Sequence, residues 1–189
     1  HLSGCEQFGA LPSGDSYLKI RKSDNYDVAS DKFVNLQQKP ILTGPGFWDN
    51  PGENWNNNFF FNSNQTRPED LMPESKIPLP YDFHESSDTI KFVWLGHSTI
   101  LVSMGGKVIL FDPIFSNAAS PVSLVVKRFQ PPVIDLASLP KIDIVVISHD
   151  HYDHLDMETI KQLHDRDISF VVPLGLGAHL EPVSYTHLT

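Results

Sequence analysis

The segment IDIVVISHDHYDH, residues 142–154, decides the fold that this sequence predicts. Residues 142–147 are a short and mostly apolar run, as expected of a β-strand that is buried on both faces. Directly after that run, the pattern His-x-His-x-Asp-His supplies the side chains of His149, His151, Asp153 and His154. A strand end that leads through a loop into a helix is a rigid frame on which such side chains can converge.

This pattern predicts a metal site, because zinc accepts imidazole nitrogen and carboxylate oxygen as ligands. His149 and His151 are two residues apart, so both rings can face one metal from an extended turn. Asp153 and His154 fall on the first turn of the expected helix and can face a second metal. Two alternatives remain: a polar loop whose histidines make ordinary hydrogen bonds, and a structural zinc clasp. Such clasps usually have closed sets of ligands and often cysteine, which the motif lacks.

Short β-rich segments surround the motif on both sides. Strands are expected at residues 89–94, 98–104, 107–111 and 168–172, and the Gly105-Gly106 pair marks a hairpin between the second and the third. Asp156 can cap a helix at about residues 157–165, and a further turn and helix are expected after Pro173. An early hairpin followed by strands that alternate with helices predicts a mixed sheet flanked by helices, in an α+β fold.

Residues 1–85 differ in character from the rest and are expected to form an irregular N-terminal arm. Asparagine, proline, glycine and serine are dense there, and the prolines between residues 40 and 80 forbid long helices and central strands. Aromatic islands at Phe47-Trp48, Trp55 and residues 59–61 indicate that the arm packs on a domain, because disorder would not explain them. That domain is expected at residues 86–182, followed by a short tail at residues 183–189.

The charge and the cysteine content exclude some classes of protein. A formal net charge of −9 argues against a nucleic-acid partner, which would be bound through clustered lysine and arginine. No apolar run of about 18 residues or more occurs, so the sequence predicts no membrane-spanning helix. Cys5 is the single cysteine, which makes an intrachain disulfide impossible.

Cys5 lies in a tetrapeptide, Leu2-Ser3-Gly4-Cys5, that resembles the cleavage box of bacterial lipoprotein signal peptides. The resemblance implies that Cys5 is lipidated and that a membrane surface is a partner. The protein would then be anchored in the bacterial cell envelope, at the outer membrane or in the periplasm. The alternative is a chance tetrapeptide in a flexible terminus, and the protein is then expected in the cytoplasm.

The histidine motif resembles the signature of the metallo-β-lactamase superfamily, whose fold is an αββα sandwich with a dinuclear zinc site between its two sheets. The resemblance implies zinc as the cofactor, with two ions in a complete site. It assigns His149 and His151 to the first zinc, and Asp153 and His154 to the second. Asp153 would also be catalytic, because it would help to hold the attacking hydroxide. Asp112 resembles the family's buried aspartate that orients the metal loop, although a plain turn-initiating Asp-Pro is the alternative.

Further stretches resemble the branch of this superfamily that contains N-acyl-phosphatidylethanolamine-hydrolysing phospholipase D and its bacterial relatives. In order, the matching pieces are WLGHST (94–99), DPIFS (112–116), Ala119-Ser120-Pro121, KRF (127–129), SHDHYDHLD (148–156) and VPLGL (172–176). Asp150 stands where some relatives carry asparagine, and the arm before residue 80 matches weakly. The related L-ascorbate-phosphate lactonases share the general motif but fit the flanking pieces less well.

Three polar residues in these pieces are weaker candidates. His97 follows a glycine at a strand break and is a candidate to line the cleft, with a plain structural histidine as the alternative. Lys127 and Arg128 are candidates to meet a phosphate, with a solvated basic pair as the default.

The resemblance also implies that the chain holds only the N-terminal half of the sandwich. The family's remaining ligands are a third histidine, a bridging aspartate and a last histidine, and all come later in its chains. Residues 155–189 offer only His164, His179 and His187, without the family context. Residues 183–189 resemble a reading frame of a DNA-library adapter, with a genuine polar tail as the alternative. We therefore expect a truncated domain with one sheet face uncovered and no catalysis by itself.

The function that these features favour is zinc-dependent hydrolysis of a phosphodiester in a phospholipid of the N-acyl-phosphatidylethanolamine type. A lactonase or other ester hydrolase on the same fold is one alternative, because the metal chemistry suits carbonyl groups too. A catalytically silent surface lipoprotein that keeps the fold for binding is another. An intact set of downstream ligands would favour the enzymes, and a missing set would favour the silent protein.

Overall fold

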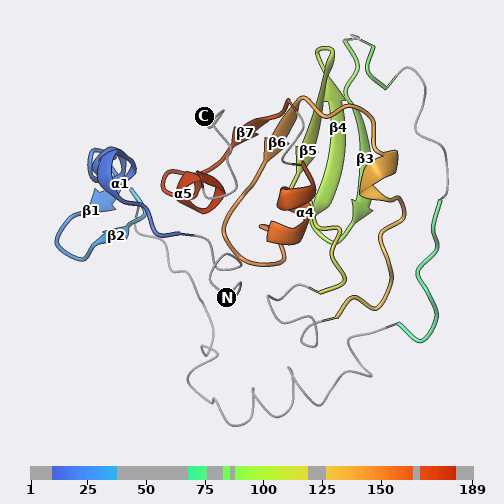
Figure 1. The fold of residues 1–189 in the computed structure, drawn as a ribbon, viewed down its shortest axis with the longest axis horizontal. Helices are drawn as coiled ribbons and strands as arrows, with labels where there is room; N and C mark the ends of the chain where they lie inside the picture. The colour runs from blue at the N-terminus through green and yellow to red at the C-terminus, as the bar shows by residue number, and fades with distance from the viewer. Residues whose placement is uncertain are drawn as a thin grey trace. The chain divides into compact units, whose positions relative to one another are not determined.

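The computed structural model describes residues 10–37, 68–75, 83–85, 88–118, 127–163 and 167–181 (Figure 1). Two compact units make up the chain, one formed by His1–Ile20 with Ser75–Thr189 and the other by Arg21–Glu74. Cys5, the aromatic islands at residues 47–61 and the tail at 183–189 lie outside the described residues. Within the described residues, no helix is long and apolar enough to cross a membrane.

Within the predicted arm, the structure adds short elements that the sequence did not announce. Helix α1 spans Gly14–Arg21, and strands β1 (Tyr26–Asp27) and β2 (Lys32–Phe33) pair as an antiparallel hairpin. The carboxylate of Asp27 accepts hydrogen bonds from the Ala29 amide and the Ser30 hydroxyl, which stabilises the turn between the strands. Strands of two residues are too short to show a pattern of alternating hydrophobic residues. The residues of the turn between them were the one available sequence signal.

The larger unit is built on a five-stranded sheet in which strand order follows chain order. Its strands are β3 (Lys91–Gly96), β4 (Thr99–Met104), β5 (Lys107–Phe111), β6 (Ile144–Val146) and β7 (Ser169–Val171). The first three pair antiparallel as a meander, and β5, β6 and β7 pair parallel. This mixed sheet confirms the predicted α+β class. The predicted first strand, residues 89–94, was placed too early. The register shifts between Trp94 and Gly96, and pairing continues through that bulge.

Parallel strands need a crossover connection, and the chain makes two. Residues 112–143 join β5 to β6 and include a short 3₁₀ helix, Leu136–Ser138. The histidine motif and helix α4 (Met157–Leu163) join β6 to β7, after which the chain enters helix α5 (Gly177–Leu180). The motif therefore lies at the carboxyl end of β6, in the loop that leads into α4 (Figure 1).

The core lies on the face of the sheet that α4 covers. One row of register partners crosses all five strands: Val93, Leu101, Leu110, Val145 and Phe170. The last four of these are fully buried and belong to the same cluster as Ile160 and Leu163 of α4. Strand alternation places every second residue of β4 in this core, which is why Thr99, Leu101 and Ser103 are buried and their neighbours are not.

The opposite face of the sheet is apolar and largely open among the described residues. Phe92 and Trp94 of β3 expose 72% and 55% of their surface, and Ile100 and Met104 of β4 expose 38% and 48%. The described residues of the larger unit thus form one sheet whose helical cover lies on one face. That arrangement agrees with one sheet of the predicted sandwich.

Adjacent residues of β4 offer a test of which face carries the stability. Leu101→Ala should lower the free energy of unfolding by about 2–5 kcal/mol, because it removes a fully buried side chain and leaves a cavity. Ile100→Ala, on the exposed face of the same strand, should cost about 1 kcal/mol or less. Urea unfolding followed by circular dichroism measures both. Equal losses would show that the core lies elsewhere.

Candidate metal centre

The histidine motif occupies a tight loop that is anchored on the sheet at its start. The Ile147 amide donates to the Val171 carbonyl at 3.1 Å, which extends the pairing of β6 with β7 up to the motif. Further on, the amides of His154 and Leu155 both donate to the His151 carbonyl, at 2.9 and 2.7 Å. The second bond closes a helical turn, so residues 151–155 have a fixed backbone course before α4 begins.

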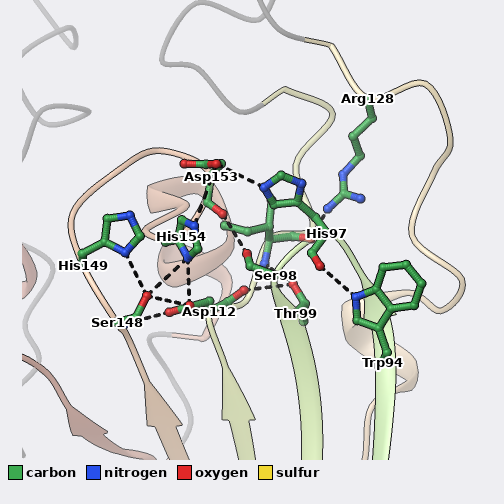
Figure 2. Close-up of polar contacts among 11 residues, drawn as sticks. Trp94, His97, Ser98, Thr99, Asp112, Arg128, Ser148, His149, Asp153 and His154 are labelled. Carbon is green, nitrogen blue, oxygen red and sulfur yellow. Dashed lines mark hydrogen bonds and ion pairs between the residues drawn. The ribbon is translucent and has the colours of Figure 1, made fainter. Parts of the chain in front are cut away.

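The side chains of His149, Asp153 and His154 lie close together on this loop (Figure 2). The ring centroid of His149 lies 4.6 Å from that of His151 and 4.0 Å from that of His154. The Asp153 carboxylate lies 3.9 Å from Nε2 of His154. The structure therefore places together all four residues that the sequence proposed as metal ligands.

Asp112 connects the end of β5 to this cluster. Its carboxylate accepts hydrogen bonds from the Ser148 amide and the Ser148 hydroxyl, both at 2.7 Å, and from Nδ1 of His154 at 2.8 Å. The Thr99 hydroxyl holds the Asp112 carbonyl at 2.9 Å. The backbone of Asp112 has a φ of 39°, a conformation that L-residues rarely keep unless their surroundings fix it. Asp112 is thus more than a turn-initiating residue, and it contacts a proposed ligand directly.

Ser148 is the residue at this site to which sequence reasoning gave no role. Its hydroxyl donates to Asp112, so its oxygen can accept from Nδ1 of His149, which lies 2.9 Å away. Accepting partners at Nδ1 keep the hydrogen on that nitrogen in both His149 and His154. The Nε2 atoms are then free to act as acceptors or ligands. A serine at the junction between an apolar strand and the histidines was the available signal.

Asp156 fixes the other end of the motif loop. As predicted, it caps α4: its Oδ1 atom accepts from the amides of Glu158 and Thr159 at 3.1 and 3.3 Å. Its Oδ2 atom accepts from the amides of Phe115 and Ser116 at 3.1 and 2.9 Å. One buried carboxylate therefore joins the helix after the motif to the loop after β5.

Lys127 and Arg128, the basic pair, lie in different environments. Lys127 is exposed, whereas the half-buried Arg128 donates to the carbonyls of Ile114 and Ser116, the latter at 3.0 Å. Burial lowers the pKa of Arg128, and the nearby Asp156 raises it in part. The Arg128 guanidinium thus stabilises the loop after β5 through hydrogen bonds, and it is not half of a solvated basic pair.

His97 lies at the centre of the site, at the turn between β3 and β4 (Figure 2). Its Nε2 atom is 3.3 Å from Oδ2 of Asp153, and the neighbouring Ser98 hydroxyl donates to the Asp153 carbonyl at 2.8 Å. Burial raises the pKa of Asp153, but the hydrogen bonds that its carboxylate makes with His97 and with its own backbone lower the pKa by more. The resulting pKa lies below the ordinary value for aspartate. His97 therefore lies beside Asp153, one of the proposed ligands.

The donor set fits a metal ion by its chemistry, since imidazole nitrogen and carboxylate oxygen are zinc ligands. His149 lies beside both His151 and His154, and Asp153 lies beside His154. Across the ranges that the structure describes, no group of three or more His, Cys, Asp or Glu residues is arranged to hold one ion together. His164 and His187 lie outside those ranges, and His179 is on α5. The motif thus supplies neighbouring donors and not a closed coordination sphere.

Known proteins resemble the chain over the same region. A family model described as the β-lactamase superfamily domain matches residues 107–187. N-acyl-phosphatidylethanolamine-hydrolyzing phospholipase D 1 of Caenorhabditis elegans is 37% identical over 171 residues, which are 79% of this chain and 48% of the relative. An uncharacterized protein of Mycobacterium tuberculosis is 45% identical over 112 residues, or 57% of this chain and 30% of the relative.

A third relative is a metal-dependent hydrolase of Caldivirga maquilingensis, 42% identical over 62 residues, or 33% of this chain and 22% of the relative. The chain spans less than half the length of each of these three relatives. The residues that the family model matches include the histidine motif, so the model covers the structural cluster.

The Asp112 network can be tested without any ligand. Asp112→Asn should lower the free energy of unfolding by about 1–3 kcal/mol, because its NH2 group would place a donor either against the Ser148 amide or against the Ser148 hydroxyl and Nδ1 of His154. Asp150→Asn, an identical change at an exposed position of the motif, should stay within about 0.5 kcal/mol of the parent. Urea unfolding measures both variants. Equal free energies of unfolding in the two variants would show that the Asp112 network does not contribute to stability.

Proposed function

We propose a phosphodiesterase function for this chain, which belongs to the metallo-β-lactamase superfamily, in the branch that resembles N-acyl-phosphatidylethanolamine-hydrolysing phospholipase D. Its relatives include metal-dependent hydrolases, and the coarse activity class of the chain is metal-dependent hydrolysis. The substrate we propose is a phospholipid of the N-acyl-phosphatidylethanolamine type, the substrate class in the name of the relative from C. elegans. The activity belongs to the whole protein, of which this chain supplies the histidine motif.

We propose zinc as the metal, with two ions in the complete site. His149 and His151 would hold the first ion, and Asp153 and His154 the second. The proximity of the four side chains supports a metal site, and the division into these two pairs follows the resemblance to the superfamily. When bound, two such ions would polarise a phosphoryl oxygen and activate water at neutral pH.

The observation that carries the proposal is the Asp112–Ser148 network. A histidine binds a metal through a nitrogen without hydrogen, so the tautomer must be fixed before the metal arrives. Asp112 fixes it directly at His154, and Ser148 extends the same control to His149. The Asp112 carboxylate thus fixes the tautomer of one proposed ligand of each metal, His154 directly and His149 through Ser148. A polar loop with histidines in ordinary roles would have no need of such an arrangement.

Asp153 is the residue that we propose as both a ligand and a catalytic group. Its pKa lies below the ordinary value for aspartate, which is itself far below neutral pH, so the carboxylate is ionised, as a ligand must be. The Asp153 carboxylate would also help to hold the attacking hydroxide beside the phosphate. Hydrolysis of an ester or a lactone at the same site is the competing activity. Rates on phosphodiester and lactone substrates separate the two.

In the complete gene product, His151→Ala and Asp153→Ala should each reduce hydrolysis of a bis-aryl phosphodiester to background, because each removes a proposed ligand. Circular dichroism should show the fold intact. Asp150→Asn, within the same motif, should keep the parent rate, and removal of metal with a chelator should abolish the activity until zinc is restored.

Parent-level turnover by either variant without bound metal would refute the mechanism. Efficient cleavage of acyl-homoserine lactones, together with no cleavage of phosphodiesters or of N-acyl-phosphatidylethanolamine, would assign the protein to the lactonases instead.

A further inference from the structure

The turn between β3 and β4 contacts Asp153 of the motif at two separate points. Nε2 of His97 contacts the Asp153 carboxylate at 3.3 Å, and the Ser98 hydroxyl donates to the Asp153 main-chain carbonyl at 2.8 Å (Figure 2). One contact therefore fixes the backbone of Asp153, and the other fixes the direction of its side chain. The two contacts come from adjacent residues that lie more than fifty positions earlier in the chain.

The direction of the first contact follows from the chemistry of its partners. An ionised carboxylate can only accept hydrogen bonds, so Nε2 of His97 must carry the hydrogen. The contact engages Oδ2 of Asp153, and the second carboxylate oxygen takes no part in it. His97 thus acts on Asp153 as a donor that orients the carboxylate through Oδ2.

The turn that presents His97 is held in an uncommon conformation. Gly96 has a φ of 103° and His97 a φ of 48°, both in the left-handed region. A φ of this sign on a histidine is uncommon and costs free energy, which the surrounding contacts must offset. The Trp94 indole supplies one such contact, since its Nε1 atom donates to the His97 carbonyl at 2.8 Å. The bulge between Trp94 and Gly96 is therefore the feature that turns His97 toward the motif.

Packing alone does not fix the side chain of Asp153. The side chains of Asp153 and His97 expose 40% and 46% of their surface, so each has room to adopt other rotamers. Directed hydrogen bonds are then the means by which a single orientation is favoured. Groups outside the ligand set that orient a ligand in this way commonly change metal affinity by about 10- to 100-fold.

We propose that the β3–β4 turn positions Asp153 for metal binding, with His97 holding its carboxylate and Ser98 its main chain. The proposal rests on the metal site proposed above and adds to it a positioning residue from another part of the sheet. His97 acts through Asp153 and is not itself a ligand. A purely structural role, in which the turn only pins the hairpin to the loop, would leave metal binding unchanged.

The test measures zinc affinity by competition with a chromophoric chelator, using Zn²⁺ alone and the complete gene product. His97→Ala should weaken zinc binding by about 10-fold or more. His97→Gln, whose amide nitrogen can donate from a similar position, should bind within about 3-fold of the parent. His84→Ala removes an exposed histidine outside the motif and controls for the loss of an imidazole. In the Asp153→Ala background, His97→Ala should have no further effect, because its partner is already gone.

Cobalt substitution gives a second readout that stability does not influence. The visible d–d bands of bound Co²⁺ report ligand geometry, so they should shift in His97→Ala and return toward the parent positions in His97→Gln. Zinc affinity and cobalt bands equal to the parent in His97→Ala would overturn the positioning role while leaving the metal site intact. Additive losses in the double variant would instead make His97 a ligand, and this too would overturn the proposal. An Asp153→Ala variant with parent affinity would refute the ligand assignment itself.

Discussion

The acceptance of three hydrogen bonds by the Asp112 carboxylate is the interaction on which the rest of the site depends. Asp112 stands where β5 ends, and all three of its donors belong to Ser148 and His154 of the motif loop. A loop that carries polar side chains cannot be held by burial of apolar surface, so directed hydrogen bonds must fix it. The parallel pairing of β5 with β6 brings the two strand ends side by side, which makes these bonds geometrically available. The sheet topology thus determines where the donors converge.

Two further contacts hold the same loop from other directions. Asp156 ties its helical end to the segment after β5, and the β3–β4 turn reaches Asp153 in its middle. Three elements that are distant in sequence therefore fix a stretch of a few residues. Rigid support of this kind is what a metal site requires, because a metal sets ligand geometry tightly and a mobile loop would lose binding free energy in becoming ordered. From the open apolar face of the sheet, Trp94 also supports the β3–β4 turn, because its indole donates to the His97 carbonyl at 2.8 Å.

Local patterns predicted most of the larger unit. β-rich composition and a short apolar run identified the five strands, and Asp156 was a correct helix cap because capping depends on neighbours only three residues away. The four donors of the motif were visible from spacing, and the structure places them together. The role of Ser148 could not be predicted in the same way, because its partner Asp112 lies 36 residues earlier. The bulge at Gly96 was also missed, since strand register depends on the partner strand. The orientation of His97 toward Asp153 follows from that bulge.

Anomalous diffraction at the zinc edge, from crystals of the zinc-loaded complete gene product, tests the central claim most directly. The account predicts two anomalous peaks, one bonded to the Nε2 atoms of His149 and His151 and the other to Asp153 and His154, at about 2.0–2.2 Å from their nitrogen and oxygen atoms. Asp112 should remain bonded to Nδ1 of His154 in that structure. Peaks bound away from residues 149–154, or no zinc at the motif under saturating metal, would contradict the account.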